Sequence, residues 1–410
     1  MKSKHLLVLI ALCALASASV GICINTAGLF YKPIAADLGV SVGSVSLTTT
    51  ILTVASSFTA LLVPKLLSEK TLRWIILTAG ILLVSGTFLM SVSSVTALLY
   101  IASVLRGLGS GLASFVLITG IVNNWYYKSH GLITSIVLSF SGIPGVIFSP
   151  VITYLIQTFG WRFAMTAVTA ATAVLFLPAL LFGITIRPQT QSLTPYGYEE
   201  FLAEKEKGNI RVLDAGEQDF SFKTTEFALA VVFIAAVCIA ASLPNYLPSF
   251  AESVDLAAIS GVILSMTLAG NILSKIVFGV IADKVNAKTA IILFAIISLT
   301  SIVVLLTMNR FAAVILAAAL TYNFTAANSS VGISILTSDL FGERNYTTVY
   351  PVLSFIGSYA MAFSNALIGL LYDKTGSFSV IFWIMIIVQG TVASAAFMGY
   401  RMRRIHTQQS

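Results

Sequence analysis

Charged residues are scarce in this sequence, and carboxylates are missing from the middle of its apolar runs. Only 10% of the 410 residues are charged, whereas 57% are hydrophobic and the mean hydropathy is +0.95. Soluble domains carry about 25% charged residues, so this composition excludes a soluble enzyme and indicates a polytopic membrane protein. All 16 acidic residues fall in loops or at the ends of apolar runs, which leaves no intramembrane carboxylate to hold a cationic substrate.

Cofactor, metal and disulfide motifs are also missing. The three cysteines, Cys13, Cys23 and Cys238, lie in apolar runs, where they give neither a disulfide framework nor the spacing of a metal site. No nucleotide-binding motif is present, so we expect no primary pump, no enzyme, no cofactor and no bound metal. The net charge of +7 is scattered over short loops, which indicates a lipid bilayer as the partner and not a nucleic acid.

Long apolar runs take up most of the chain. A membrane-spanning helix needs about 20 apolar residues, and twelve runs reach that length. They lie near residues 6–31, 42–67, 73–92, 95–120, 131–157, 163–186, 225–248, 257–282, 288–308, 311–337, 348–371 and 377–400. The sequence therefore predicts an all-α membrane protein with an N-terminal six-helix bundle (1–186), a cytoplasmic connecting loop (187–224) and a C-terminal six-helix bundle (225–410).

The basic residues predict the orientation. Placing both termini in the cytoplasm puts 17 of the 23 Lys and Arg residues on that side and leaves only Lys32, Arg162, Arg310 and Lys374 outside. Cytoplasmic loops carry the excess of basic residues, so we expect a multi-pass protein of the cell membrane with both termini inside. The N-terminal segment is similar to a signal peptide, but its apolar run extends to Phe30, and we interpret it as an uncleaved first transmembrane helix.

The two halves are related by an internal repeat. At an offset of 215 residues Tyr31 matches Tyr246, and the motif Leu-Ser-Phe-x-Gly that begins at Leu138 recurs at Leu353. Repeats in the same direction after six helices imply two halves related by an axis along the membrane normal. Substrate is expected near the midplane between such halves.

Two cations inside the apolar runs determine the expected chemistry. Arg106 opens the segment RGLGSG of the fourth run, and Lys275 lies about eight residues before the polar exit at Asp283. A charge in hydrocarbon is costly and marks a substrate or ion pathway, so two cations without a carboxylate predict an anion-binding cavity. Asn271, one turn before Lys275 on the same face, adds a donor for a carboxylate. Two interpretations of Arg106 stay open: a brace on backbone carbonyls, or a contact with substrate.

Two motifs carry a resemblance to known transporters. Gly279-x-x-x-Asp283-Lys284, followed by Lys288, resembles the cytoplasmic loop signature of the major facilitator superfamily. The stretch WYYKSHGLITSIVLSFSG (125–142) resembles the fifth-helix signature of monocarboxylate transporters and of the bacterial oxalate/formate antiporters. The resemblance implies transport by alternating access, with Gly279, Asp283, Lys284 and Lys288 as parts of a gating loop.

The same resemblance implies substrate contacts. In monocarboxylate transporters a cation on the eighth helix, four residues before a glycine, binds the substrate carboxylate, which implies that role for Lys275. The family residue is typically Arg, and Lys lacks its planar fork, so the substrate geometry is expected to differ. A tenth-helix tyrosine lines the cavity of bacterial relatives, which implies the same of Tyr322. Asn25 stands where some animal members have a lysine, so coupling by protons or by a counter-anion stays open.

The sequence therefore predicts a monomeric secondary transporter of a small organic anion, with a monocarboxylate as the expected class. Its predicted substrate contacts are Lys275, Asn271, Tyr322, Asn25 and Arg106. Two rival functions stay open. A drug/proton efflux antiporter is favoured by the stretch SGIPGVIFSP (141–150), but the missing intramembrane carboxylate counts against it. A non-transporting membrane sensor would be expected to carry an appended soluble domain or enlarged external loops, and neither is visible.

Overall fold

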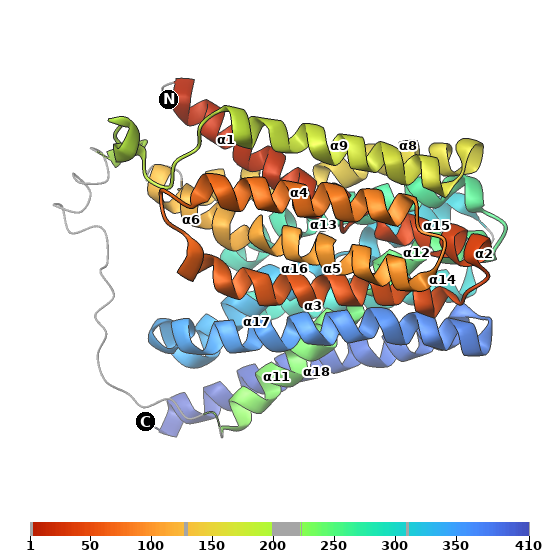
Figure 1. Ribbon diagram of the computed structural model, residues 1–410. Helices are drawn as coiled ribbons and strands as arrows, with labels where there is room; N and C mark the ends of the chain where they lie inside the picture. The colour runs from red at the N-terminus through yellow and green to blue at the C-terminus, as the bar shows by residue number, and fades with distance from the viewer. Residues whose placement is uncertain (1–2, 127–129, 199–221, 223, 309–310, 410) are drawn as a thin grey trace. The chain divides into compact units, whose positions relative to one another are not determined.

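The computed structural model of the chain is almost entirely helical (Figure 1). It describes residues 3–126, 130–198, 222, 224–308 and 311–409. Within these ranges the strand-like pairing is limited to one parallel bridge, between Tyr126 and Tyr196. The predicted all-α membrane class is confirmed.

The helical elements are consecutive along the chain, with short turns between most of them. Up to residue 191 they are α1 (Ser3–Ala16), η1 (Ser17–Ile22), η2 (Ala27–Phe30), α2 (Tyr31–Leu38), α3 (Val42–Leu66), α4 (Leu72–Ser91), α5 (Thr96–Leu112), α6 (Phe115–Trp125), α7 (His130–Ser139), α8 (Ile143–Phe159), α9 (Trp161–Leu181) and η3 (Pro188–Gln191). From residue 225 they are α11 (Thr225–Ala240), η4 (Leu243–Tyr246), α12 (Leu247–Ser253), η5 (Ala257–Ile259), α13 (Ser260–Lys284), α14 (Ala287–Thr307), α15 (Ala312–Tyr322), α16 (Thr325–Ala327), η6 (Asn328–Gly332), α17 (Ile333–Thr375) and α18 (Phe378–Gln409).

Eleven segments in the described ranges are long and apolar enough to span a membrane, and they correspond to eleven of the twelve predicted runs. The run predicted at 257–282 has those bounds, whereas the first run extends beyond its prediction to Ser3–Leu38. A helix satisfies its backbone polar groups internally, as hydrocarbon requires, but several of these segments are interrupted by turns, such as residues 23–26 in the first.

The predicted run 311–337 is not among these eleven segments, and in the structure it is divided among α15, α16, η6 and the start of α17. Two asparagines accompany the break. The amide of Asn323 donates to the carbonyl oxygen of Thr267, and that of Asn328 donates to the carbonyl oxygen of Ile291 at 3.1 Å. Both bonds join this region to other segments, and a count of apolar residues along the sequence does not register them.

The chain divides into two compact units, Met1–Val40 with Leu47–Val212, and Ser41–Ser46 with Leu213–Ser410. Each unit has its own apolar core. That of the first contains Val8, Leu12 and Leu15 of α1, and that of the second contains the buried rings Phe233, Phe278, Phe294 and Phe324. The predicted connector 187–224 lies largely outside the described residues, so its bounds and those of the two bundles stay predictions.

The first membrane segment of each half ends in the same succession of elements. In the first half the 3-10 turn η2 leads into the short helix α2, and in the second half η4 leads into α12. Tyr31 and Tyr246, which match in the sequence repeat, lie at these two junctions and are both completely buried. The recurrence supports the internal repeat that the sequence indicates.

Candidate functional site

The helix α13, which carries Lys275, has a buried side and an apolar exposed side. Polar and aromatic residues at helical spacing are buried: Thr267, Ser274 and Phe278. Large aliphatic residues of the other side are exposed: Leu273, Ile276 and Val280. This division is that of a helix packed on one side and open to lipid on the other.

Close contacts fix α13 against its neighbours. Gly270 lies so near the carbonyl group of Leu320 on α15 that a Cβ atom would collide with it. One turn earlier, the carbonyl oxygen of Thr267 accepts the hydrogen bond from Asn323. The ring of Phe278 meets that of Phe294 on α14 edge to face, with centroids 5.3 Å apart. The helix that presents Lys275 is therefore rigidly held on its buried side.

Lys275 points away from both of these sides of α13. At 100° per residue its direction lies about 130° round the helix from the centre of the exposed aliphatic side. The side chain is exposed, and among the residues that the structure describes none forms a hydrogen bond or an ion pair with it. Asn271 and Gly279 lie one turn to either side on the same face, and nothing lies within 4 Å of the Cβ position of Gly279. The face therefore combines an unpaired ammonium group, an amide and open space.

Arg106 has the opposite environment. Its side chain is 4% exposed. The guanidinium donates to the carbonyl oxygen of Cys23 at 2.5 Å, to Cys23 Sγ at 3.3 Å and to Met90 Sδ at 3.0 Å. These contacts join α5 to α4 and to the irregular turn that follows η1. They fit the interpretation of Arg106 as a brace.

The other two predicted substrate contacts are engaged with protein groups. The amide of Asn25, which is half-buried, donates to the carbonyl oxygen of Ser141 at 2.8 Å. Tyr322 is completely buried, and its hydroxyl donates to the carbonyl oxygen of Ala240 at 2.6 Å. Neither residue shares a helix face with Lys275, and their contact with substrate stays a prediction.

The residues of the predicted gating loop lie in two helices: Gly279, Asp283 and Lys284 belong to the last turns of α13, and Lys288 to the first turn of α14. Lys284 is exposed at the end of α13, and the ammonium group of Lys288 lies 4.4 Å from the ring centroid of Phe397 on α18. Asn286 caps α14, because its side chain accepts a hydrogen bond of 2.7 Å from the backbone N–H of Thr289. The side chain of Asp283 lies outside the described residues, so its gating role stays a prediction.

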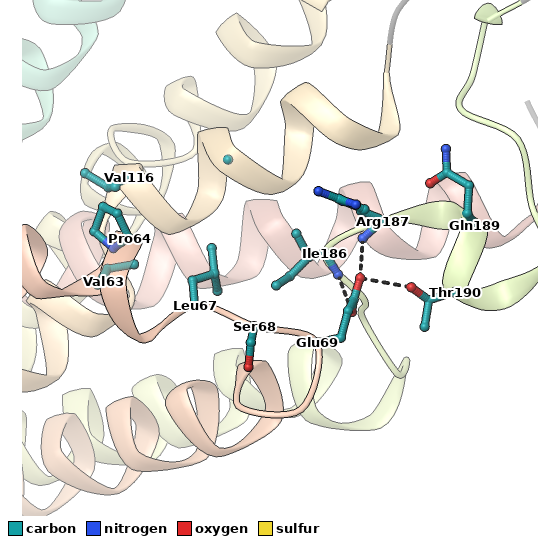
Figure 2. Close-up of a pocket in the computed structure, with 11 residues that line it drawn as sticks. Val63, Pro64, Leu67, Ser68, Glu69, Val116, Ile186, Arg187, Gln189 and Thr190 are labelled. Atoms are coloured by element: carbon teal, nitrogen blue, oxygen red, sulfur yellow. Dashed lines mark hydrogen bonds between the residues drawn. The ribbon is translucent and has the colours of Figure 1, made fainter.

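The structure shows a second polar cluster, which the sequence did not indicate, in the first unit (Figure 2). Glu69 follows α3, and its carboxylate accepts from the backbone N–H groups of Ile186 and Arg187 at 3.0 and 2.8 Å and from the hydroxyl of Thr190 at 2.9 Å. A cavity of about 770 Å³ lies beside it. Its walls come from 63–69, 116–120 and 186–190, three segments too far apart in the sequence for a motif to reveal them.

Comparison with known proteins identifies the family. Residues 13–364 match the Major Facilitator Superfamily. The chain is 24% identical over 340 residues to an uncharacterised MFS-type transporter, YhjX, of Escherichia coli K12, covering 80% of this chain and 79% of that one. It is 25% identical over 365 residues to human monocarboxylate transporter 12, covering 81% and 69%.

Solved structures share the fold at low sequence identity. The nucleoside transporter NupG superposes with a TM-score of 0.72 at 12% identity, covering 98% of this chain and all of that one. A D-xylose–proton symporter superposes with a TM-score of 0.69 at 14% identity and 96% coverage of both chains. The helical fold is that of these transporters. Because the family model matches residues 13–364, the chain belongs to the Major Facilitator Superfamily.

Proposed function

We propose that this superfamily transporter moves a small organic anion, of the monocarboxylate class, and that Lys275 pairs with the carboxylate of the substrate. The exposed, unpaired state of Lys275 within a membrane span is the observation that carries the proposal. A cation in that position is costly unless it serves a pathway or meets an anion. The substrate itself would supply the missing charge.

The neighbouring groups favour a carboxylate over a cation. In the eleven described spans no acidic residue lies deeper than the terminal turn of its span. Lys275 is therefore not neutralised by a carboxylate of its own helix face. The amide of Asn271 can donate a second hydrogen bond to the same carboxylate, and the open space at Gly279 leaves room for it. A cationic drug would meet only repulsion from this face.

The relatives support the class of substrate unequally. Monocarboxylate transporter 12 is named for monocarboxylates and aligns over most of this chain. The nucleoside and xylose transporters share the fold alone, because their identities to this chain are 12% and 14%. The charge of the site, and not the fold, thus favours the anion.

Thermal stability of the purified full-length protein tests the proposal. The protein is titrated with acetate, lactate, pyruvate, oxalate and succinate, and with tetraphenylphosphonium as a lipophilic cation. A ligand that binds only the folded state stabilises it by about 2.7 kcal/mol at a hundred times its dissociation constant. We expect a shift with at least one carboxylate, retained in Lys275→Arg and lost in Lys275→Gln.

A matched variant separates the loss of this particular cation from a general loss of charge. Lys374 is exposed at the end of α17, so Lys374→Gln should keep the full carboxylate shift. A carboxylate shift that survives in Lys275→Gln would remove Lys275 from the site. A shift with tetraphenylphosphonium and none with any acid would replace the anion proposal by efflux of cations.

A further inference from the structure

The cavity beside Glu69 is lined by two charged residues, Glu69 and Arg187, and by two apolar walls. Val63, Pro64 and Leu67 at the end of α3 form one apolar wall, and Val116 of α6 and Ile186 form another. Ligand pockets are typically about 300–1,000 Å³, mostly apolar, with a few placed polar groups. At about 770 Å³ the cavity falls in this range.

Arg187 supplies the positive charge of the lining. Its side chain is exposed and lines the cavity, and its guanidinium has no hydrogen-bond or ion-pair partner among the described residues. Figure 2 shows it extending away from the carboxylate of Glu69, whose dashed bonds run to backbone N–H groups and to Thr190. The carboxylate of Glu69 thus holds the segment after α9 through its backbone N–H groups and Thr190. The guanidinium N–H groups of Arg187 can therefore donate to a ligand. An anion with an apolar body matches this lining.

The surroundings indicate that such an anion would come from the membrane. Leu61, Leu62 and Leu66, on the last turns of α3, are each about half exposed or more, as is typical of a helix end in contact with lipid. Exposed basic side chains lie within and just after this helix end: Lys65, Lys70 and Arg73. Clusters of this kind beside a membrane helix attract anionic head groups.

We propose that this cavity binds an anionic phospholipid, with its phosphate on the Arg187 guanidinium and the upper part of an acyl chain along Val63, Leu67 and Val116. A bidentate bond from guanidinium to phosphate supplies the specificity, and the apolar walls favour a lipid over free inorganic phosphate. The site is separate from Lys275 and goes beyond the transport proposed above. Because Arg187 lies in the segment after α9, lipid binding there would make the stability of this segment depend on the anionic lipid content of one leaflet.

Native mass spectrometry of the full-length protein tests the assignment with dioleoyl phosphatidylglycerol as the probe and dioleoyl phosphatidylcholine as its neutral counterpart. We expect at least tenfold preference for phosphatidylglycerol. Arg187→Gln and Gly120→Leu should each remove that preference, the second by filling the cavity. No atom lies within 4 Å of the Cβ position of Gly120, so its side chain can be enlarged without a clash inside the protein.

Matched controls lie outside the cavity. Lys374→Gln removes an exposed cation at the end of α17, outside the basic cluster, and Gly390→Leu enlarges another helical glycine whose Cβ position is open. Both should keep the preference, as should Lys275→Gln, which distinguishes this site from the proposed transport site. Equal binding of both lipids, or an unchanged preference in Arg187→Gln and Gly120→Leu, would overturn the proposal. If the protein bound decanoate but not phosphatidylglycerol, the proposal of a phospholipid would be wrong, and the cavity would be a site for a free amphiphilic anion.

Discussion

At the scale of single residues, the guanidinium of Arg106 is hydrogen-bonded to neutral groups among the residues that the structure describes. A carbonyl oxygen and two sulfur atoms receive its hydrogen bonds, and the side chain is almost completely buried. Such a charge is stable only while hydrogen bonds compensate it, because an unpaired charge in the interior is costly. The planar fork of Arg, and not charge alone, is what the position requires.

Arg106→Lys should therefore lower the free energy of unfolding by about 1–3 kcal/mol, since the retained charge loses part of its hydrogen bonding. Denaturant titration of the purified protein measures the change. Arg73→Lys, at an exposed position, should leave the stability unaltered. If Arg106→Lys were as stable as the wild type but unable to transport, Arg106 would act on substrate and not as a brace.

Lys275 and Arg106 give the same signal in the sequence, each being a lone cation in an apolar run. Only the coordinates separate them, because Arg106 finds partners on α4 and on the turn after η1, whereas Lys275 remains exposed. Periodicity correctly places Asn271 beside Lys275, since both lie on one helix. It does not reveal that the hydroxyl of Tyr322 is bonded to Ala240, because that contact joins separate helices.

At the scale of the elements, close glycine contacts determine how α13 lies against α15. A methyl group at Gly270 would collide with the backbone of Leu320, and backbone cannot move aside as a flexible side chain can. The apolar run 257–282 predicts the span. It does not predict this contact, because a glycine in a membrane helix can equally lie against lipid.

Gly270→Ala should destabilise the protein by about 1–3 kcal/mol or more, because overpacking shifts whole helices. Gly390→Ala places the same methyl group on α18 where nothing lies within 4 Å, and it should be neutral. Thermal unfolding of the two variants side by side measures the difference. Equal melting temperatures would show that α13 and α15 do not approach as closely as described.

Gly279 offers a different test, because a Cβ atom there meets nothing within 4 Å. Gly279→Ala should therefore fold with wild-type stability, measured by the same thermal unfolding. Because Gly279 belongs to the predicted gating loop, we expect the variant to slow transport in proteoliposomes by reducing the space that another conformation needs. Unimpaired transport would remove Gly279 from the gate and leave the loop motif without a mechanical role.

At the scale of the whole molecule, the basic residues lie unevenly along the spans. Lys65 lies in the last turn of α3, Lys70 in the turn that follows, and Arg73 at the start of α4. Lys284 and Lys288 lie on either side of the turn between α13 and α14. The opposite ends carry few, such as Lys374 at the end of α17. Because cytoplasmic loops carry the excess of basic residues, this distribution predicts which ends of the spans lie in the cytoplasm. The positions of the helices alone do not predict it.

Labelling of single introduced cysteines in intact cells tests this orientation. The native cysteines Cys13, Cys23 and Cys238 are all buried, so they give little background. Lys70 and Lys374 are both exposed: Lys70 lies in the turn between the spans Val42–Leu66 and Leu72–Ser91, and Lys374 lies at the end of the span Val352–Thr375. A membrane-impermeant maleimide should label Lys374→Cys in intact cells, and Lys70→Cys only after the membrane is permeabilised. The reverse pattern would place Arg187 and its cavity on the outer face, where the proposed lipid would have to come from the other leaflet.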